Sequence, residues 1–131
     1  MNIISTSGNT KSPNLILNHK SDDLLVDLKE ETWNFLKKSL FDVVNSPGGT
    51  GVNAKIINGG IVSGKTGTVE NPPNEPHSWF AGYLETGDDI LTIAVIVENG
   101  GKGSVTATPI AKNFFDKYLE MVRVEELPNV Q

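Results

Sequence analysis

The sequence predicts an α+β fold, in which an antiparallel three-stranded sheet is flanked by helices. Two segments, 28–45 and the stretch that opens at Thr108-Pro109, carry apolar residues at steps of three and four, the period of one helix face. The three segments between them are rich in β-branched and aromatic residues and are separated by glycine- and proline-rich stretches. The chain has 131 residues, enough for one domain, so these elements are expected to share a core.

The first predicted helix covers residues 28–45, preceded by a loop and extended lead-in over residues 1–23. Asp27 and Glu30 fit a capping box, which pairs a side-chain acceptor at the helix start with a glutamate three residues later. The run Ser46-Pro47-Gly48-Gly49 predicts the end of the helix, because proline cannot continue it and glycine accepts the left-handed exit. Its expected apolar face consists of Trp33, Leu36, Leu40, Val43 and Val44.

The predicted strands are 61–69, 79–84 and 90–98. A loop is expected at 71–76, which holds three prolines, and a hairpin turn at 86–89. The third strand is apolar on both faces, which is typical of a central strand.

The closing helix is predicted to begin with Thr108 as its cap and Pro109 at its first helical position. Its expected apolar face consists of Ile110, Phe114, Tyr118, Met121 and Val122. Trp33 of the first helix and the pair Phe114/Phe115 are predicted to lie in the core, and residues 124–131 to form a frayed tail.

Composition limits the classes of function. The net charge of −5 argues against nucleic acid or an anionic membrane surface as a partner, since both favour clusters of Lys and Arg. The chain contains no cysteine, which excludes disulfides, thiol catalysis and Cys-ligated zinc, and its two histidines are too few for a histidine metal cage. The sequence shows neither a signal peptide nor an apolar run of the ~20 residues that a membrane helix needs.

One lysine admits two interpretations. Residues 59–66 match the phosphate-binding pattern GxxxxGK[ST], which requires a helix immediately after its last residue. Residues 67–73 contain glycine, β-branched residues and two prolines, which disfavour that helix. A P-loop nucleotide-binding protein therefore remains an alternative. It requires a helix directly after Thr66, so the structure of that segment tests it.

The second interpretation takes Lys65-Thr66-Gly67 as a K-T-G element. Thr68 follows it directly, and His77, Trp79, Phe80 and Gly82 follow after the proline-rich stretch. Together with the flanking helices, this order resembles the C-terminal part of the transpeptidase domain of penicillin-binding proteins. The resemblance implies that residues 1–131 form the C-terminal segment of one domain with a β-lactamase/transpeptidase-like fold. It also implies a peptidoglycan D,D-transpeptidase acting by serine acylation.

The residues suit this resemblance on physical grounds. A peptide can pair with the backbone of an edge strand, and Gly67 has no side chain to block its approach. Lys65 offers a cation, and the Thr68 hydroxyl can bond a carboxylate. The resemblance implies that Lys65, Thr66, Gly67 and Thr68 bind substrate. It further implies that Lys65 takes part in catalysis and that the Thr68 backbone N–H lines the oxyanion hole.

Three aromatic side chains are candidates for the wall of this site. His77, Trp79 and Phe80 follow the proline-rich stretch, close to the K-T-G element in the predicted hairpin. His77 is expected to act as a structural hydrogen-bonding group rather than as a proton shuttle, and at least one of Trp79 and Phe80 is expected in the core.

The nucleophile of this family is the serine of S-x-x-K, and no serine here has a lysine three residues later. Ser7-Gly8-Asn9 formally matches a second family motif, S-x-N, and is interpreted as a coincidence. The chain alone is therefore predicted to be inactive. A non-catalytic β-lactam-recognising sensor or binding module is the alternative function.

The resemblance also implies the partners and the compartment. Peptidoglycan stem peptides and β-lactams would bind the complete domain, and no cofactor is implied. The family sheet has two further strands beside the last strand of this chain, so strand 90–98 is expected to expose an apolar edge. Self-association, or pairing with the missing N-terminal part, is expected to cover it. The parent protein is expected to be anchored in the bacterial cytoplasmic membrane with this domain outside the cytoplasm.

Overall fold

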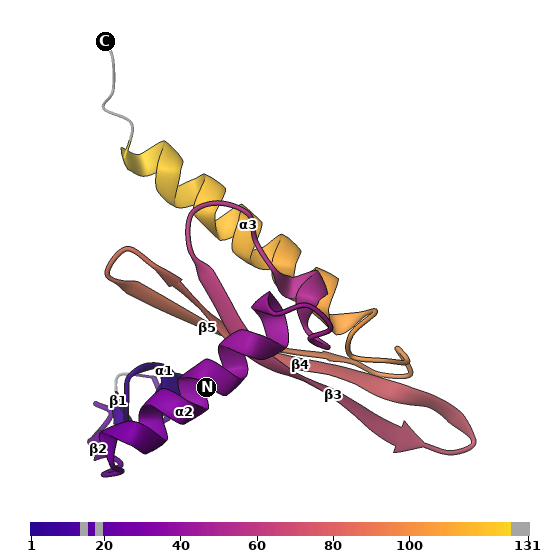
Figure 1. The fold of residues 1–131 in the computed structure, drawn as a ribbon, viewed down its shortest axis with the longest axis horizontal. Coiled ribbons are helices and arrows are strands. Elements are labelled where there is room, and N and C mark those ends of the chain that lie inside the picture. Colours follow the sequence, from indigo (N-terminus) through magenta and orange to yellow (C-terminus); the bar gives the residue numbers. More distant parts are fainter. Residues whose placement is uncertain (14–15, 18–19, 127–131) are drawn as a thin grey trace.

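The computed structural model of the chain describes residues 1–13, 16–17 and 20–126 (Figure 1). The predicted α+β architecture with a three-stranded antiparallel sheet and flanking helices is confirmed. None of the helices in these ranges is long and apolar enough to cross a membrane. In chain order the elements are α1 (Asn2–Ser5), β1 (Asn9–Lys11), β2 (Asp23–Leu25), α2 (Glu30–Asn45), the 3-10 helix η1 (Val52–Ala54), β3 (Ile61–Asn71), β4 (Asn74–Thr86), β5 (Asp89–Val97) and α3 (Ala107–Glu126).

The main sheet has the strand order β3-β4-β5, with both neighbouring pairs antiparallel. The prediction that the third strand is central is wrong for this chain, because β4 is central and β5 is an edge among the described strands. Alternate β5 residues such as Leu91 and Ile93 pack against the core, whereas Ile90 and Ile96 are exposed. The strand is apolar on both faces, as its sequence indicates, but only one of these faces is covered.

The two hairpins of this sheet turn tightly. Gly87 and Asp88 join β4 to β5, and the φ of +56° at Gly87 explains why glycine suits this position. The loop predicted at 71–76 is wrong, because only Pro72 and Pro73 lie outside the strands. Pro76 is accommodated in β4 because the register shifts opposite it, between Val69 and Asn71, where the ladder is already irregular.

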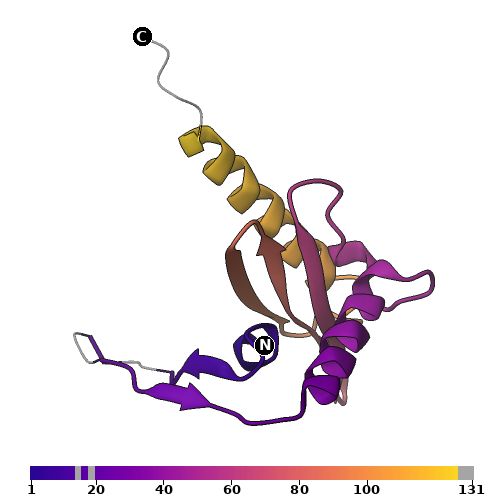
Figure 2. The ribbon, with the colours of Figure 1, turned by 60° about the vertical axis from the view of Figure 1, so that its left-hand side comes forward.

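Helix α3 runs across one face of the sheet (Figure 2) and presents a different side from the one predicted. Ala107, Ala111, Phe115 and Leu119 are buried against the sheet. Of the predicted face, Tyr118 packs against the core. Ile110, Phe114 and Met121 are 45%, 48% and 66% exposed, so the prediction that Phe114 lies in the core is wrong. The two buried alanines, rather than the larger side chains, allow the helix backbone to approach the strands closely. The helix is thereby rotated by one residue from the expected side.

Helix boundaries differ from the predictions in local detail. Lys29 is the N-cap of α2 and no side chain caps it, so the capping box of Asp27 and Glu30 is wrong. Glu30 and Glu31 instead occupy the first turn, where acidic groups suit the helix dipole. The end at Asn45 is as predicted, and Trp33 is buried.

Helix α3 begins at Ala107, so Thr108 lies inside the helix, where its hydroxyl donates to the Ser104 carbonyl oxygen at 3.0 Å. The helix continues to Glu126, into the predicted tail, of which residues 127–131 lie outside the described part. Within the predicted lead-in of 1–23 the structure adds α1 and β1, while residues 14–15 and 18–19 lie outside the described part.

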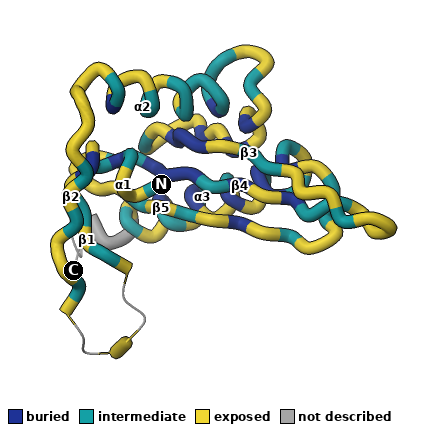
Figure 3. The backbone as a smooth tube through the Cα atoms, turned by 90° about the horizontal axis from the view of Figure 1, so that it is seen from below, coloured by how far each residue is buried: buried dark blue, intermediate teal, exposed yellow. Residues whose placement is uncertain are grey.

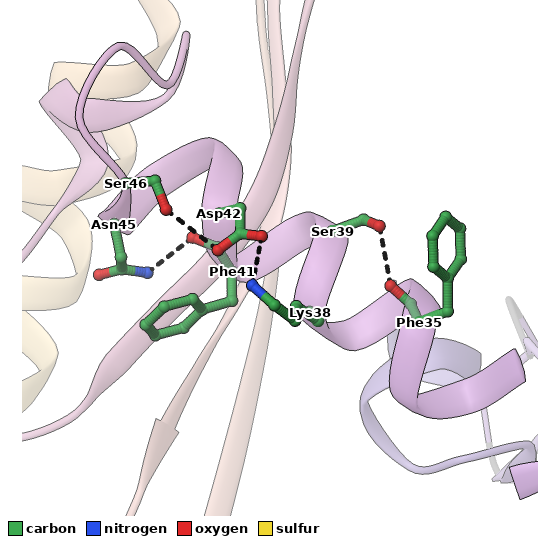
Figure 4. A network of polar contacts seen from close by, with 7 residues as sticks. All are labelled: Phe35, Lys38, Ser39, Phe41, Asp42, Asn45 and Ser46. Carbon is green, nitrogen blue, oxygen red and sulfur yellow. Dashed lines mark hydrogen bonds and ion pairs between the residues drawn. The ribbon is translucent and has the colours of Figure 1, made fainter. Parts of the chain in front are cut away.

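Helix α2 lies beside β3, on the side away from β5 (Figure 3). Side-chain hydrogen bonds stabilise its C-terminal end, since Asp42 accepts hydrogen bonds from Lys38 at 2.6 Å and from Ser46 at 3.0 Å (Figure 4). These two bonds hold the pKa of the Asp42 carboxyl below its usual value. Asn45 then links the helix to the sheet, because its side-chain amide donates to the carbonyl oxygens of Phe41 at 3.0 Å and Val62 at 2.8 Å.

We predict that Asn45→Ala destabilises the chain by about 1–3 kcal/mol, because the partly buried Val62 carbonyl loses its partner. Ser39→Ala is the matched control, since the Ser39 hydroxyl donates only to the Phe35 carbonyl of its own helix (Figure 4). Urea unfolding followed by circular dichroism measures both variants. Equal loss of stability in the two variants would contradict a specific role for the link between α2 and β3.

Candidate functional site

The residues of the K-T-G element lie in the middle of β3, in an extended strand at the rim of the sheet. An open groove of about 450 Å³ runs along the sheet face beside them. It is lined by Met1, Lys65, Thr66, Gly67, Val69, Trp79 and Ala81. The structure therefore brings four of the predicted site residues, Lys65, Thr66, Gly67 and Trp79, around one groove.

The backbone of β3 has its free hydrogen-bonding groups on the side away from β4. In a regular strand, alternate residues direct both N–H and C=O to the same side. The Val62 carbonyl faces α2 rather than β4, since it accepts the hydrogen bond from Asn45. Thr66 and Thr68 share the parity of Val62, and the pairing with β4 stays regular through Val69. The N–H groups of Thr66 and Thr68 therefore point outward, where an incoming extended chain could pair with them.

Lys65 is an exposed lysine on the groove side of the strand. Its ammonium group donates to the carbonyl oxygen of Thr66 at 2.6 Å. The Thr66 hydroxyl lies 2.7 Å from the hydroxyl of Thr50, which belongs to the loop that leaves α2. These contacts hold the cation close to the strand edge and attach the loop of Thr50 to the same point.

Glycine at position 67 suits the close approach of β3 to its neighbour on β4. A Cβ atom at Gly67 would lie 3.1 Å from the Cβ of Trp79, its Cα partner in the ladder. Such a side chain would also stand on the groove face, which Gly67 lines. Because glycine has no side chain, nothing projects from position 67 into the groove beside Lys65.

Thr68 is contacted from the loop that follows β5. Its hydroxyl oxygen accepts a hydrogen bond from the backbone N–H of Gly103 at 3.2 Å. Thr68 is itself exposed at the strand edge, so the hydroxyl proton and the outward N–H remain accessible. It does not line the groove, because its side chain lies on the other face of β3.

The three candidate wall residues take different positions. Trp79 is 36% exposed and lines the groove, whereas Phe80 is fully buried in the core and is no part of the wall. One of the two aromatic residues thus lies in the core, as expected. The Nδ1 atom of His77 accepts a hydrogen bond from the backbone N–H of Asn99 at 3.0 Å. That contact is a structural hydrogen bond of the kind expected for His77, which does not line the groove although its Cα partner Val69 does.

The alternative phosphate-binding interpretation fails on the course of the chain. A P-loop turns into a helix directly after its last threonine or serine. Here the strand continues without interruption from Ile61 through Thr66 to Asn71. Among the described residues, no group of three or more His, Cys, Asp or Glu side chains could hold a metal ion.

Three residues that were not predicted as site residues also contribute to this region: Met1, Thr50 and Gly103. Thr50 stands between two glycines ahead of the K-T-G element, but its position in the sequence does not predict the contact with Thr66. Gly103 belongs to a glycine-rich stretch that reads as an ordinary loop, and its neighbour Thr68 is 35 positions away. Contacts between such distant residues have no periodic signal in the sequence.

Comparison with known families agrees with the geometry. The sequence model of the family described as penicillin binding protein transpeptidase domain matches residues 1–116. The peptidoglycan D,D-transpeptidase MrdA of Haemophilus influenzae is 32% identical over 118 residues, covering 79% of this chain and 18% of that protein. MrdA of Acinetobacter baumannii is 30% identical over 105 residues, covering 69% and 15%. The chain therefore spans about a fifth of the length of these relatives or less.

A solved structure has the same fold. In the crystal structure of Pseudomonas aeruginosa PBP2 in complex with WCK 5153, a region covering 22% of that chain superimposes on 79% of this one. The TM-score is 0.65 and the sequence identity is 24%. The likeness supports the arrangement of strands and helices described above.

Proposed function

We propose, from the premise that this chain belongs to the penicillin-binding protein transpeptidase domain family, that it anchors the substrate in a peptidoglycan D,D-transpeptidase. The observation that carries the proposal is the free edge of β3, where Lys65, Thr68 and two outward N–H groups lie together. A stem peptide or a β-lactam would lie along this edge as an added strand.

The chemistry assigns a task to each group on β3. A serine from the rest of the domain attacks the carbonyl carbon of the penultimate D-alanine of a stem peptide. The bond to the terminal D-alanine breaks, and that residue leaves as a protonated amine while the acyl group stays on the serine. The amine of a second stem peptide then attacks the ester and releases the serine. β-Lactams enter by the same first step and remain as the acyl-enzyme.

The Thr68 backbone N–H donates to the carbonyl oxygen as negative charge develops on it, half of an oxyanion hole. The Lys65 ammonium provides positive charge at the reacting serine or at the substrate carboxylate. To do so, it gives up its hydrogen bond to the Thr66 carbonyl oxygen. The Thr68 hydroxyl donates to the same carboxylate. Such charge-assisted bonds are stronger than neutral ones.

We propose further that the part of the domain bearing the serine docks on the groove face of the sheet. Part of that face is apolar and exposed: Trp79, Ile90 and Ile96 are 36%, 41% and 51% exposed. Lys65 projects from the same face, so docking there would bring the serine to the cation. We propose that the parent protein acts on peptidoglycan from the cytoplasmic membrane, with this domain outside the cytoplasm.

A chimera tests the proposed function. The aligned segment of Haemophilus influenzae MrdA is replaced by this chain, so that the relative supplies the rest of the domain. We expect fluorescent penicillin to label the chimera but not the chain alone, which has no S-x-x-K serine. Lys65→Met in the chimera should lower the labelling rate on the order of 100-fold, as expected for loss of a transition-state donor.

Lys55→Met is the matched control, because Lys55 is an exposed lysine outside the groove lining. It should leave the labelling rate of the chimera unchanged. A chimera that folds, as judged by circular dichroism and gel filtration, and yet is not labelled would overturn the proposed function.

The isolated chain is predicted to self-associate through the uncovered face and edge of β5. Sedimentation velocity should show dimers or larger species, and Ile96→Lys should shift the population toward monomer, because it places a charge on that face. Ile57→Lys is the control: Ile57 is 87% exposed and lies in the loop before β3. A monomeric native chain, or equal effects of the two substitutions, would rule out association through β5.

A further inference from the structure

The loop that joins β5 to α3 packs directly on the K-T-G strand. Gly103, in this loop, is buried. A Cβ atom at this position would lie 2.3 Å from the Gly67 carbonyl oxygen and 2.5 Å from the Trp79 carbonyl oxygen. Both are backbone atoms of paired strands, so neither can rotate away as a flexible side chain could. Only glycine fits between this loop and the sheet in the arrangement observed.

Gly103 also makes the hydrogen bond that orients Thr68. Its backbone N–H donates to Thr68 Oγ1 at 3.2 Å. A hydroxyl has one proton and two acceptor positions, so the bond uses an acceptor position and leaves the proton free to donate. Accepting a hydrogen bond also polarises a hydroxyl and makes it a better donor. The contact thus prepares Thr68 to donate to an anionic ligand.

The position of Gly103 is fixed by two other elements. Ser78 is fully buried and is the Cα partner of Thr68 on β4. Its hydroxyl donates to the Lys102 carbonyl oxygen and accepts from the Ala107 N–H, both at 3.1 Å. The Gly103 carbonyl accepts from the Thr108 N–H at 3.2 Å. The sheet and the first turn of α3 therefore hold both sides of Gly103.

We propose that Gly103 is a positioning residue, which sets the place and the donor direction of Thr68 at the substrate edge. The proposal rests on the proposed function, since it gives Thr68 a reaction in which to act. Gly103 itself touches no substrate. Its effect passes through the Gly67 backbone, against which it packs, and through the hydroxyl of Thr68, to which it donates.

The test is Gly103→Ala in the MrdA chimera, measured as the rate of acylation by penicillin and as the melting temperature. Gly60→Ala is the matched control: a Cβ there would lie 2.4 Å from the Glu85 carbonyl oxygen, at the opposite end of β3. We expect acylation to fall about tenfold or more for Gly103→Ala, since small misplacements of reacting groups cost up to ~100-fold. Gly60→Ala should lower the melting temperature similarly and leave the acylation rate within about threefold. Equal losses of acylation in the two variants would overturn the positioning role.

The hydrogen bond is tested separately on the chain alone. Thr68→Val removes the acceptor, and Thr68→Ser keeps it. NMR-detected hydrogen exchange at the Gly103 amide should become about tenfold faster in Thr68→Val, because that amide loses its partner, and should stay unchanged in Thr68→Ser. Unchanged exchange in both variants would overturn the proposal. This measurement needs no acylation, so its failure is distinguishable from a failure of the proposed function.

Discussion

The fold depends on one constraint: β3 must lie at the edge of the sheet with part of its backbone left unpaired. An exposed edge normally invites pairing with other chains, and proteins cover or blunt such edges. Here α2 covers the beginning of β3, with Asn45 donating to the Val62 carbonyl. From Thr66 onward the edge is left open, beside Lys65 and the groove. The first half of β3 is therefore held by α2, and the second half presents the open edge that the proposed function uses as a binding surface.

Close backbone approach makes this division possible. Gly67 lets β3 pass near Trp79 without raising a side chain above the groove, and Gly103 lets the next loop reach the same pair of strands from the other face. Gly67 and Trp79 form one pair of the ladder, and Gly103 packs on that pair from the face opposite the groove. Lys65 and Thr68 lie on different faces of β3, and no side chain at position 67 or 103 stands between them and the strand edge.

The sequence predicted the elements that depend on local composition and missed those that depend on packing. The β-branched residues of segment 61–69 located β3, which extends two residues further, and the proline after Ser46 located the end of α2. The buried side of α3 was mispredicted, because Ala107 and Ala111 carry little hydrophobic signal although they set the distance between helix and sheet. The strand edge beside Lys65 followed from the motif, whereas Gly103 and Thr50 reach it only through tertiary contacts that no sequence spacing encodes.

The exposed apolar side chains and the cation of the candidate site lie on one face of the sheet. Apolar side chains at Trp79, Ile90 and Ile96 sit on the same sheet face as Lys65, so hydrophobic burial and the assembly of a charged site would be achieved by one docking event. Burying this face would lower the local dielectric around the ammonium group and strengthen its interaction with a carboxylate or an oxyanion. The electrostatic interaction of a solvent-exposed lysine, such as Lys65 in this chain, is much weaker. In the proposed function, the apolar surface around Lys65 therefore contributes to catalysis as well as to stability. It determines how completely water is excluded from the ammonium group when the rest of the domain is docked.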